Sequence, residues 1–305
     1  MNDLIAVTVN NKIRRNRRDL IFDIVTYFIL GTVLLIVAYP LYFVIISSIS
    51  NPAAVARGDI LFFPVGLSLD GYTAVFEHAE VMRSFANSMW YTFIGTSINL
   101  FVTLPAAYAL SRRDLRKRTI FIVFFMIPMY FSGGLIPTYL VVRNLQMIDT
   151  IWAITVPVAL NVYNMLVAMA FFRANLSQEL LEAAKMDGCT NTGFFLRIAL
   201  PLSAPIIAIL VLWYGVQHWN SYVSALIYLS SREKWPLQLV LRTILILDAS
   251  AIANIRDPAE IRRLQDLAAL MKYSLIIVSS APILFLYPFI QKHFVKGVMI
   301  GSVKG

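Results

Sequence analysis

Charge is scarce in this sequence. Aspartate, glutamate, lysine and arginine together make up 14% of its 305 residues, whereas about 25% is usual for a soluble domain. Hydrophobic residues account for 59% of the chain, and the mean hydropathy is +0.71. This composition excludes an ordinary soluble domain and indicates an integral membrane protein.

Cysteine and the common catalytic motifs are almost absent as well. The one cysteine, Cys189, excludes an intramolecular disulfide and has no Cys/His spacing of a metal site beside it. The patterns GxxxxGK[ST], HExxH and GxSxG are missing, and the histidines are limited to His78, His218 and His293. We therefore expect no catalytic site, no metal site and no nucleotide bound by this chain.

The net charge of +9 has a topological explanation. Lysine and arginine gather in short segments beside apolar runs, which is where membrane topology places them. We therefore expect membrane lipid, and not nucleic acid, as the partner of this positive charge.

Six apolar runs without interior charge are each long enough to cross a bilayer, which takes about 20 residues per helix. They are Ile24–Ile49, Ser88–Leu110, Thr119–Leu140, Thr150–Phe172, Pro201–Leu229 and Tyr273–Ile290. The first run follows basic residues but is longer than a signal-peptide core, so we interpret it as a retained helix. The predicted fold is an all-α integral membrane protein with six transmembrane helices over residues 21–291.

The basic residues also predict the orientation. Lysine and arginine are concentrated in segment 12–18, in the connection 112–118 and after the last apolar run, and such segments stay in the cytoplasm. Both termini are then cytoplasmic, as a basic arm over residues 1–20 and a tail over residues 292–305. With an even number of spans, the connection from Phe172 to Pro201 lies on the same side.

This connection carries clear helix signals. Ser177 suits the N-cap of a helix over Glu179–Met186, and Gly188 supplies the permissive backbone that ends it. The apolar surface of this helix is expected from Leu180, Ala183, Ala184 and Met186. A short amphipathic helix over about 177–188 either lies in the headgroup layer or inserts into a groove of a partner, and periodicity does not distinguish the two.

A motif in the same connection resembles a known family. The run Glu182-Ala183-Ala184, followed by Asp187-Gly188 and later by Ile198, Leu200 and Pro201, resembles the EAA loop of ATP-binding-cassette (ABC) importer permeases. In that family the loop forms a coupling helix that rests in a cleft of a separate ATPase subunit. The resemblance implies a type I ABC importer permease fold, with ATPase-coupling residues at Glu182, Ala183, Ala184, Asp187 and Gly188.

Longer segments resemble the MalG-like permeases of carbohydrate importers, in the branch for oligosaccharides and polysaccharide fragments. These segments are NSMWYTFIGTSINLFVTLPAAYALSRRDLRKR, GGLIPTYL, HWNSYVSALIYL and the tail QKHFVKGVMIGSVKG. The resemblance implies a non-catalytic subunit in the bacterial cytoplasmic membrane that forms half of a carbohydrate pore. Its partners would be a second, different permease, two ATPase subunits that handle ATP and Mg, and an extracytoplasmic solute-binding protein.

Polar residues within the spans are candidates for a substrate path, because buried polar groups in a membrane usually face a partner helix or an aqueous cavity. In the fifth run, Trp213, Gln217, Asn220 and Ser224 recur at helical spacing as a stripe along one face, and Tyr214, His218 and Tyr222 lie beside it. The expected path residues are Trp213, Gln217, Asn220, Tyr222, Asn161 and Asn164. Aromatic faces stack on sugar rings and amides bond to hydroxyls, but interhelical hydrogen bonding and an aromatic belt explain the same residues. His218 is expected to be a hydrogen-bonded packing residue. No lysine or arginine lies within a span, which favours a neutral sugar or recognition by the other permease.

Two other transporter classes compete with this interpretation. A permease for peptides or amino acids would share the EAA loop, but the sugar-type tail disfavours it. An ion-driven secondary transporter should show inverted repeats and an intramembrane acidic residue or charge pair, and neither is seen.

Overall fold

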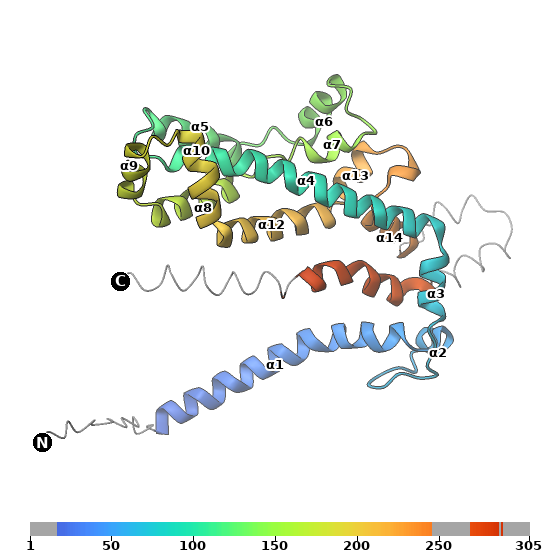
Figure 1. Ribbon diagram of the computed structural model, residues 1–305. Coiled ribbons are helices and arrows are strands. Elements are labelled where there is room, and N and C mark those ends of the chain that lie inside the picture. The colour runs from blue at the N-terminus through green and yellow to red at the C-terminus, as the bar shows by residue number, and fades with distance from the viewer. Residues whose placement is uncertain (1–16, 246–268, 287, 289–305) are drawn as a thin grey trace, which may run out of the picture. The chain divides into compact units, whose positions relative to one another are not determined.

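The computed structural model describes residues 17–245, 269–286 and 288 (Figure 1). Most of the expected basic arm over residues 1–20 and the whole expected tail over residues 292–305 lie outside the described residues, as does His293. The chain divides into two compact units, Met1–Leu67 and Ser68–Gly305.

The first unit contains α1 (Arg17–Ser48) and α2 (Pro52–Arg57). After α1 the chain folds back on its own end: the Tyr39 hydroxyl donates to the Leu61 carbonyl at 3.3 Å, and Ser50 forms an antiparallel bridge with Leu67. The unit is therefore one long apolar helix closed at its C-terminal end by a short loop.

Helices are the regular secondary structure in the described residues of the second unit. It contains α3 (Asp70–Glu77), α4 (Ala79–Ser111), α5 (Arg118–Tyr130), α6 (Leu135–Asn144), α7 (Ile151–Thr155), α8 (Val162–Asn175), α9 (Gln178–Met186), α10 (Asn191–Phe194), the π-helical turn η1 (Phe195–Ala199), α11 (Leu200–Leu202), α12 (Ala204–Trp219), α13 (Val223–Tyr228), the 3-10 turn η2 (Arg232–Lys234), α14 (Leu237–Leu245) and a last helix over Ala269–Leu286.

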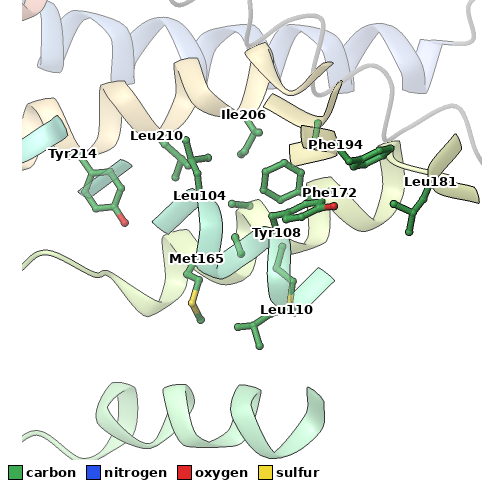
Figure 2. Packing of buried hydrophobic residues seen from close by; sticks show 14 of the residues in the cluster. Leu104, Tyr108, Leu110, Met165, Phe172, Leu181, Phe194, Ile206, Leu210 and Tyr214 are labelled. Carbon is green, nitrogen blue, oxygen red and sulfur yellow. The ribbon is translucent and has the colours of Figure 1, made fainter. Parts of the chain in front are cut away.

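Helix α4 is the axis of this unit. It packs against α8, α12 and α14. In Figure 1, α5, α9 and α10 lie at one end of α4, and α6, α7 and α13 lie toward the other. The buried residues beside the α9 end come from α4, α8, α9, α10 and α12, and Figure 2 shows Tyr108, Phe172 and Phe194 close together among them. One part of α4 is covered by these neighbours, whereas the apolar side chains of Trp90, Phe93 and Phe101 are exposed.

The number of uninterrupted apolar helices among the described residues is smaller than the six predicted spans. Among the described residues, three helices are long and apolar enough to cross a membrane: α1, α4 and Ala269–Leu286. The count reaches five if two bent pairs each form one span, α5 with α6 (111°) and Asn191–Leu202 with α12 (80°). The total of six stays a prediction.

The expected third, fourth and fifth runs are wrong as continuous helices. Thr119–Leu140 breaks after Tyr130, where two consecutive glycines weaken a helix. Thr150–Phe172 breaks between α7 and α8 in a segment that contains Pro157, which cannot donate a helical hydrogen bond. Pro201–Leu229 breaks between α12 and α13.

Candidate functional site

Helix α9 has the ends that its sequence predicts. The Ser177 hydroxyl accepts the backbone N–H of Leu180 at 3.2 Å, which caps the helix. Gly188 follows the helix with a φ of +77°, a left-handed conformation that glycine adopts without steric cost. The predicted cap and the predicted stop are both confirmed.

The two faces of α9 are distinct. Leu181 and Ala184, three residues apart, are buried against the rest of the unit. Of the residues expected to form the apolar surface, Ala184 is buried within the unit, whereas Ala183 is exposed and Met186 is 87% exposed. Glu182 is also exposed and accepts from the Gln178 amide at 2.9 Å. The helix is therefore held on one side and open on the other.

An aromatic cluster supports the packed face of α9. Tyr108, near the end of α4, lies against Phe172 with ring centroids 5.8 Å apart and against Phe195 at 5.0 Å. Phe194, directly after the loop that follows α9, stacks on the same tyrosine at 6.3 Å. These rings connect α4, α8 and the α10 segment, and Leu181 and Ala184 of α9 belong to the same buried cluster.

A charged network lies next to this cluster. Arg112 donates to both carboxylate oxygens of Asp114 and to the Tyr108 hydroxyl. Lys185 of α9 lies 3.6 Å from the same carboxylate. The hydrogen bonds from Arg112 are the main cause that lowers the pKa of Asp114 to about 2 and raises the pKa of Arg112. Asp114 thus stays ionised and joins the α4–α5 connection to α9.

The expected path residues are only partly brought together. Trp213 is half-buried in α12, with its ring 6.0 Å from that of Tyr163 in α8. Gln217 is exposed on the same helix. Asn220 and Tyr222 are exposed in the break after α12, so the stripe that was expected to continue to Ser224 along one helix ends at that break.

The two asparagines of the fourth run have different roles in the structure. Asn161 is the N-cap of α8, and its side-chain oxygen accepts the backbone N–H of Asn164 at 3.1 Å. Asn164 itself is buried. Tyr163 is exposed beside Trp213 and was not among the predicted path residues. Its position between Asn161 and Asn164 in the sequence could have indicated it.

A buried polar network at the middle of α4 joins α4, α12 and the break between α7 and α8. The Asn99 amide donates to the Val158 carbonyl at 2.6 Å, within the α7–α8 break, and its oxygen lies 2.6 Å from Nε2 of His218. With Asn99 in this orientation His218 must donate from Nε2. The carbonyl freed by the break near Pro157 is therefore satisfied by α4. The prediction that His218 is a hydrogen-bonded packing residue is confirmed.

The other end of the unit is closed by Asp149, which the sequence did not point out. Its carboxylate accepts the backbone N–H groups of Ser230 and Ser231 at 3.0 and 2.9 Å, together with the Ser231 hydroxyl and the Lys234 ammonium, both at 2.6 Å. Bonding to Lys234 and then to Ser231 lowers the pKa of Asp149. This residue ties the α6–α7 connection to the α13–η2 connection.

We expect Asp149→Asn to lower the free energy of local opening at this junction by about 1–3 kcal/mol, because the charged hydrogen bonds to Lys234 and Ser231 are lost. Hydrogen exchange at the Ser230 and Ser231 amides should speed up, whereas Asp59→Asn, in an exposed pair with Arg57, should leave them unchanged. Because folding lowers this pKa, the stabilisation is complete above the unfolded value of about 3.9 and declines as the pH falls below it. Equal exchange in Asp149→Asn and the parent chain would contradict this role.

Metal-binding clusters do not occur in the part of the chain that is described: no group of three histidine, cysteine, aspartate or glutamate side chains is placed to hold an ion. The assembled features are a helix with one free face, a charged and aromatic support below it, and a polar junction in the middle of the bundle.

Comparison with known proteins defines the class. Residues 87–300 match the family described as binding-protein-dependent transport system inner membrane component. The chain belongs to this family and is a multi-pass membrane protein with an ABC importer permease fold.

Particular relatives agree with this assignment. The chain is 40% identical to protein LplC of Bacillus subtilis, over 93% of this chain and 95% of LplC. It is 39% identical to the polygalacturonan/rhamnogalacturonan transport system permease protein YtcP of the same organism, over 94% of this chain and 100% of YtcP. A solved bacterial ABC transporter involved in the import of the acidic polysaccharide alginate has a chain that matches with a TM-score of 0.83 at 30% identity, covering 92% of this chain and 99% of that one.

Proposed function

We propose that this chain forms half of the translocation pore of an ABC importer for an oligosaccharide, and that α9 couples it to a separate ATPase subunit. The observation that carries the coupling role is the division of α9, with Leu181 and Ala184 buried in the permease and Glu182 and Met186 exposed. A helix fixed on one side and open on the other suits insertion into a partner's groove. Gly188 and Asp187 end this helix, and Ala183 lies on its open face.

The proposed topology has six crossings over residues 21–291. In it α1, α4 and the last helix each cross once. The α5–α6, α7–α8 and α12–α13 segments, each interrupted between its two helices, supply the other three crossings. The basic arm over residues 1–20, the α4–α5 connection, α9 and the tail over residues 292–305 are then cytoplasmic. Asp149 and its partners lie on the outer side.

The proposed complex contains a second, different permease, two ATPase subunits that bind ATP and Mg, and an extracytoplasmic binding protein. Family membership supports partners of these kinds in general. It also disfavours an ion-driven secondary transporter, and the polysaccharides named for YtcP and the alginate importer favour a carbohydrate over a peptide.

Uptake into proteoliposomes that contain the complete complex tests this proposal. We expect ATP-dependent uptake of labelled oligosaccharides and none of a tripeptide of similar size. The polygalacturonan named for YtcP favours an acidic sugar, whereas the lack of lysine and arginine within the predicted spans favours a neutral one. Uptake of acidic oligogalacturonides is therefore compared with uptake of neutral arabino-oligosaccharides. Uptake of the peptide alone would overturn the carbohydrate assignment.

A second experiment tests the substrate path. We propose that sugar rings stack on Trp213 and Tyr163, while the amides of Gln217, Asn220 and Asn161 face the hydroxyls, with Asn164 and Tyr222 nearby. Trp213→Ala should raise the KM for uptake about three- to tenfold, because one stacking surface is lost. Trp90→Ala, an exposed tryptophan of α4, is the matched control and should not change KM. An unchanged KM in both variants would remove Trp213 from the path.

A further inference from the structure

A cavity of about 490 Å³ opens beside the first turn of α9. It lies among the end of α4, the start of α5, the end of α8 and the start of α9, and its size is within the range of pockets that bind small ligands. Its charged lining consists of Arg112, Arg113, Arg118, Arg173 and Glu179. The lining therefore includes four arginines and a single acidic residue.

Three of these arginines have no acidic partner among the described residues. Arg112 is engaged with Asp114, but within the described ranges no acidic group lies within ion-pair distance of Arg113, Arg118 or Arg173. Like charges brought together in a partly enclosed space repel one another, and an anion with several oxygens relieves that repulsion through charge-assisted hydrogen bonds. The N-terminus of the nine-residue helix α9 also faces this space and favours negative charge.

The position of the cavity favours a lipid over other anions. Arg118 is the first residue of α5, and the apolar Ile120 and Phe121 that follow it are 63% and 47% exposed. Tyr108 and Leu176 also line the cavity. Charge thus adjoins apolar surface at the end of several helices, which is where a phosphate headgroup lies when its acyl chains run along a helix. A free anion or an acidic protein segment would gain nothing from that apolar surface.

We propose that this cavity binds the phosphate headgroup of an anionic phospholipid of the cytoplasmic leaflet. The proposal relies on the cytoplasmic placement of α9 given above. Because Ser177 and Glu179 of α9 share the cavity with Arg112 of the α4–α5 connection, a bound headgroup contacts the base of the coupling helix and the network that joins it to α4. Anionic lipid then strengthens coupling between the ATPase and the pore.

Lipid binding to the purified complex tests this site. We compare retention of phosphatidylglycerol and phosphatidylcholine by native mass spectrometry, and ATP hydrolysis in nanodiscs of each lipid. The triple variant Arg113→Gln, Arg118→Gln, Arg173→Gln should retain phosphatidylglycerol about tenfold less. The control Arg116→Gln, Lys117→Gln, Arg197→Gln removes the same charge from exposed positions that do not line the cavity and should stay within about twofold of the parent.

Each other outcome overturns the proposal. Equal losses of phosphatidylglycerol in both triple variants would mean that the lipid is attracted by surface charge in general. Unchanged retention in the Arg113, Arg118 and Arg173 variant would mean that the lipid binds elsewhere. Displacement by millimolar inorganic phosphate would identify a free anion as the occupant. Loss of the ATPase subunits with phosphatidylglycerol retained would identify an acidic segment of that partner.

Two further variants separate folding and coupling from lipid binding. If the glutamine variant fails to assemble, the matching lysine substitutions keep the charge, and they should restore retention of phosphatidylglycerol. Glu182→Lys lies outside the cavity and should keep lipid retention even though coupling is lost, so failure of the docking proposal and failure of the lipid proposal give different results.

Discussion

Charge reversal at Glu182 is expected to reduce substrate-stimulated ATP hydrolysis of the complete complex about tenfold or more. The residue is exposed on the face of α9 opposite Leu181 and Ala184, so Glu182→Lys leaves the packing of the permease intact. A charge of the wrong sign at a protein interface costs several kcal/mol, and 1.4 kcal/mol is about tenfold. ATP hydrolysis with and without substrate in proteoliposomes is the measurement.

The control for this experiment is Glu77→Lys, the same substitution at an exposed site in α3. It should leave hydrolysis unchanged. Gly188→Pro should also uncouple the complex, because proline cannot adopt the φ of +77° that ends α9. Full coupling and normal assembly in both Glu182→Lys and Gly188→Pro would refute the docking role of α9.

Gly95→Ala and Gly215→Ala are expected to change stability in opposite directions. A Cβ at Gly95 would lie 2.5 Å from the His218 ring, so the imidazole must move and its hydrogen bond to Asn99 is lost. We expect the free energy of unfolding of Gly95→Ala to be about 1–3 kcal/mol lower than that of the parent chain. A Cβ at Gly215 would meet its nearest neighbours, in Thr96 and Thr92, at 3.9 and 4.0 Å, which is ordinary contact. There alanine should stabilise α12 by up to about 1 kcal/mol.

Thermal unfolding in detergent, followed by tryptophan fluorescence, measures both variants. The pair is matched, because both glycines lie within helices that pack on each other and both changes add one methyl group. Equal stability of Gly95→Ala and the parent chain would mean that the His218–Asn99 contact does not hold α4 and α12 together.

The sequence predicted the features that depend on neighbouring residues. The cap at Ser177 and the stop at Gly188 are local, and both are found. Which side of α9 packs against the permease was not predicted, since adjacent Leu180 and Leu181 fit two helical stripes and only packing against the other helices selects Leu181.

Features that depend on distant residues were not predictable in the same way. Asn99 and His218 are 119 residues apart, and no local pattern pairs them. Asp149 acts on Ser231, 82 residues away. Apolar length gave the approximate spans, but the places where helices break depend on which neighbouring group can satisfy the freed carbonyl, as Asn99 does for Val158.

The bend between Asn191–Leu202 and α12 makes an elbow of two arms, of which the first includes the π-helical turn η1. The chain bends by 80° there, close to a right angle, and Ser203 at the joint is buried with no hydrogen-bond partner for its hydroxyl among the described residues. Under the proposed coupling role, a push along the first arm would displace the near end of α12 almost perpendicular to its axis. That displacement would tilt the helix that carries Trp213 and Gln217.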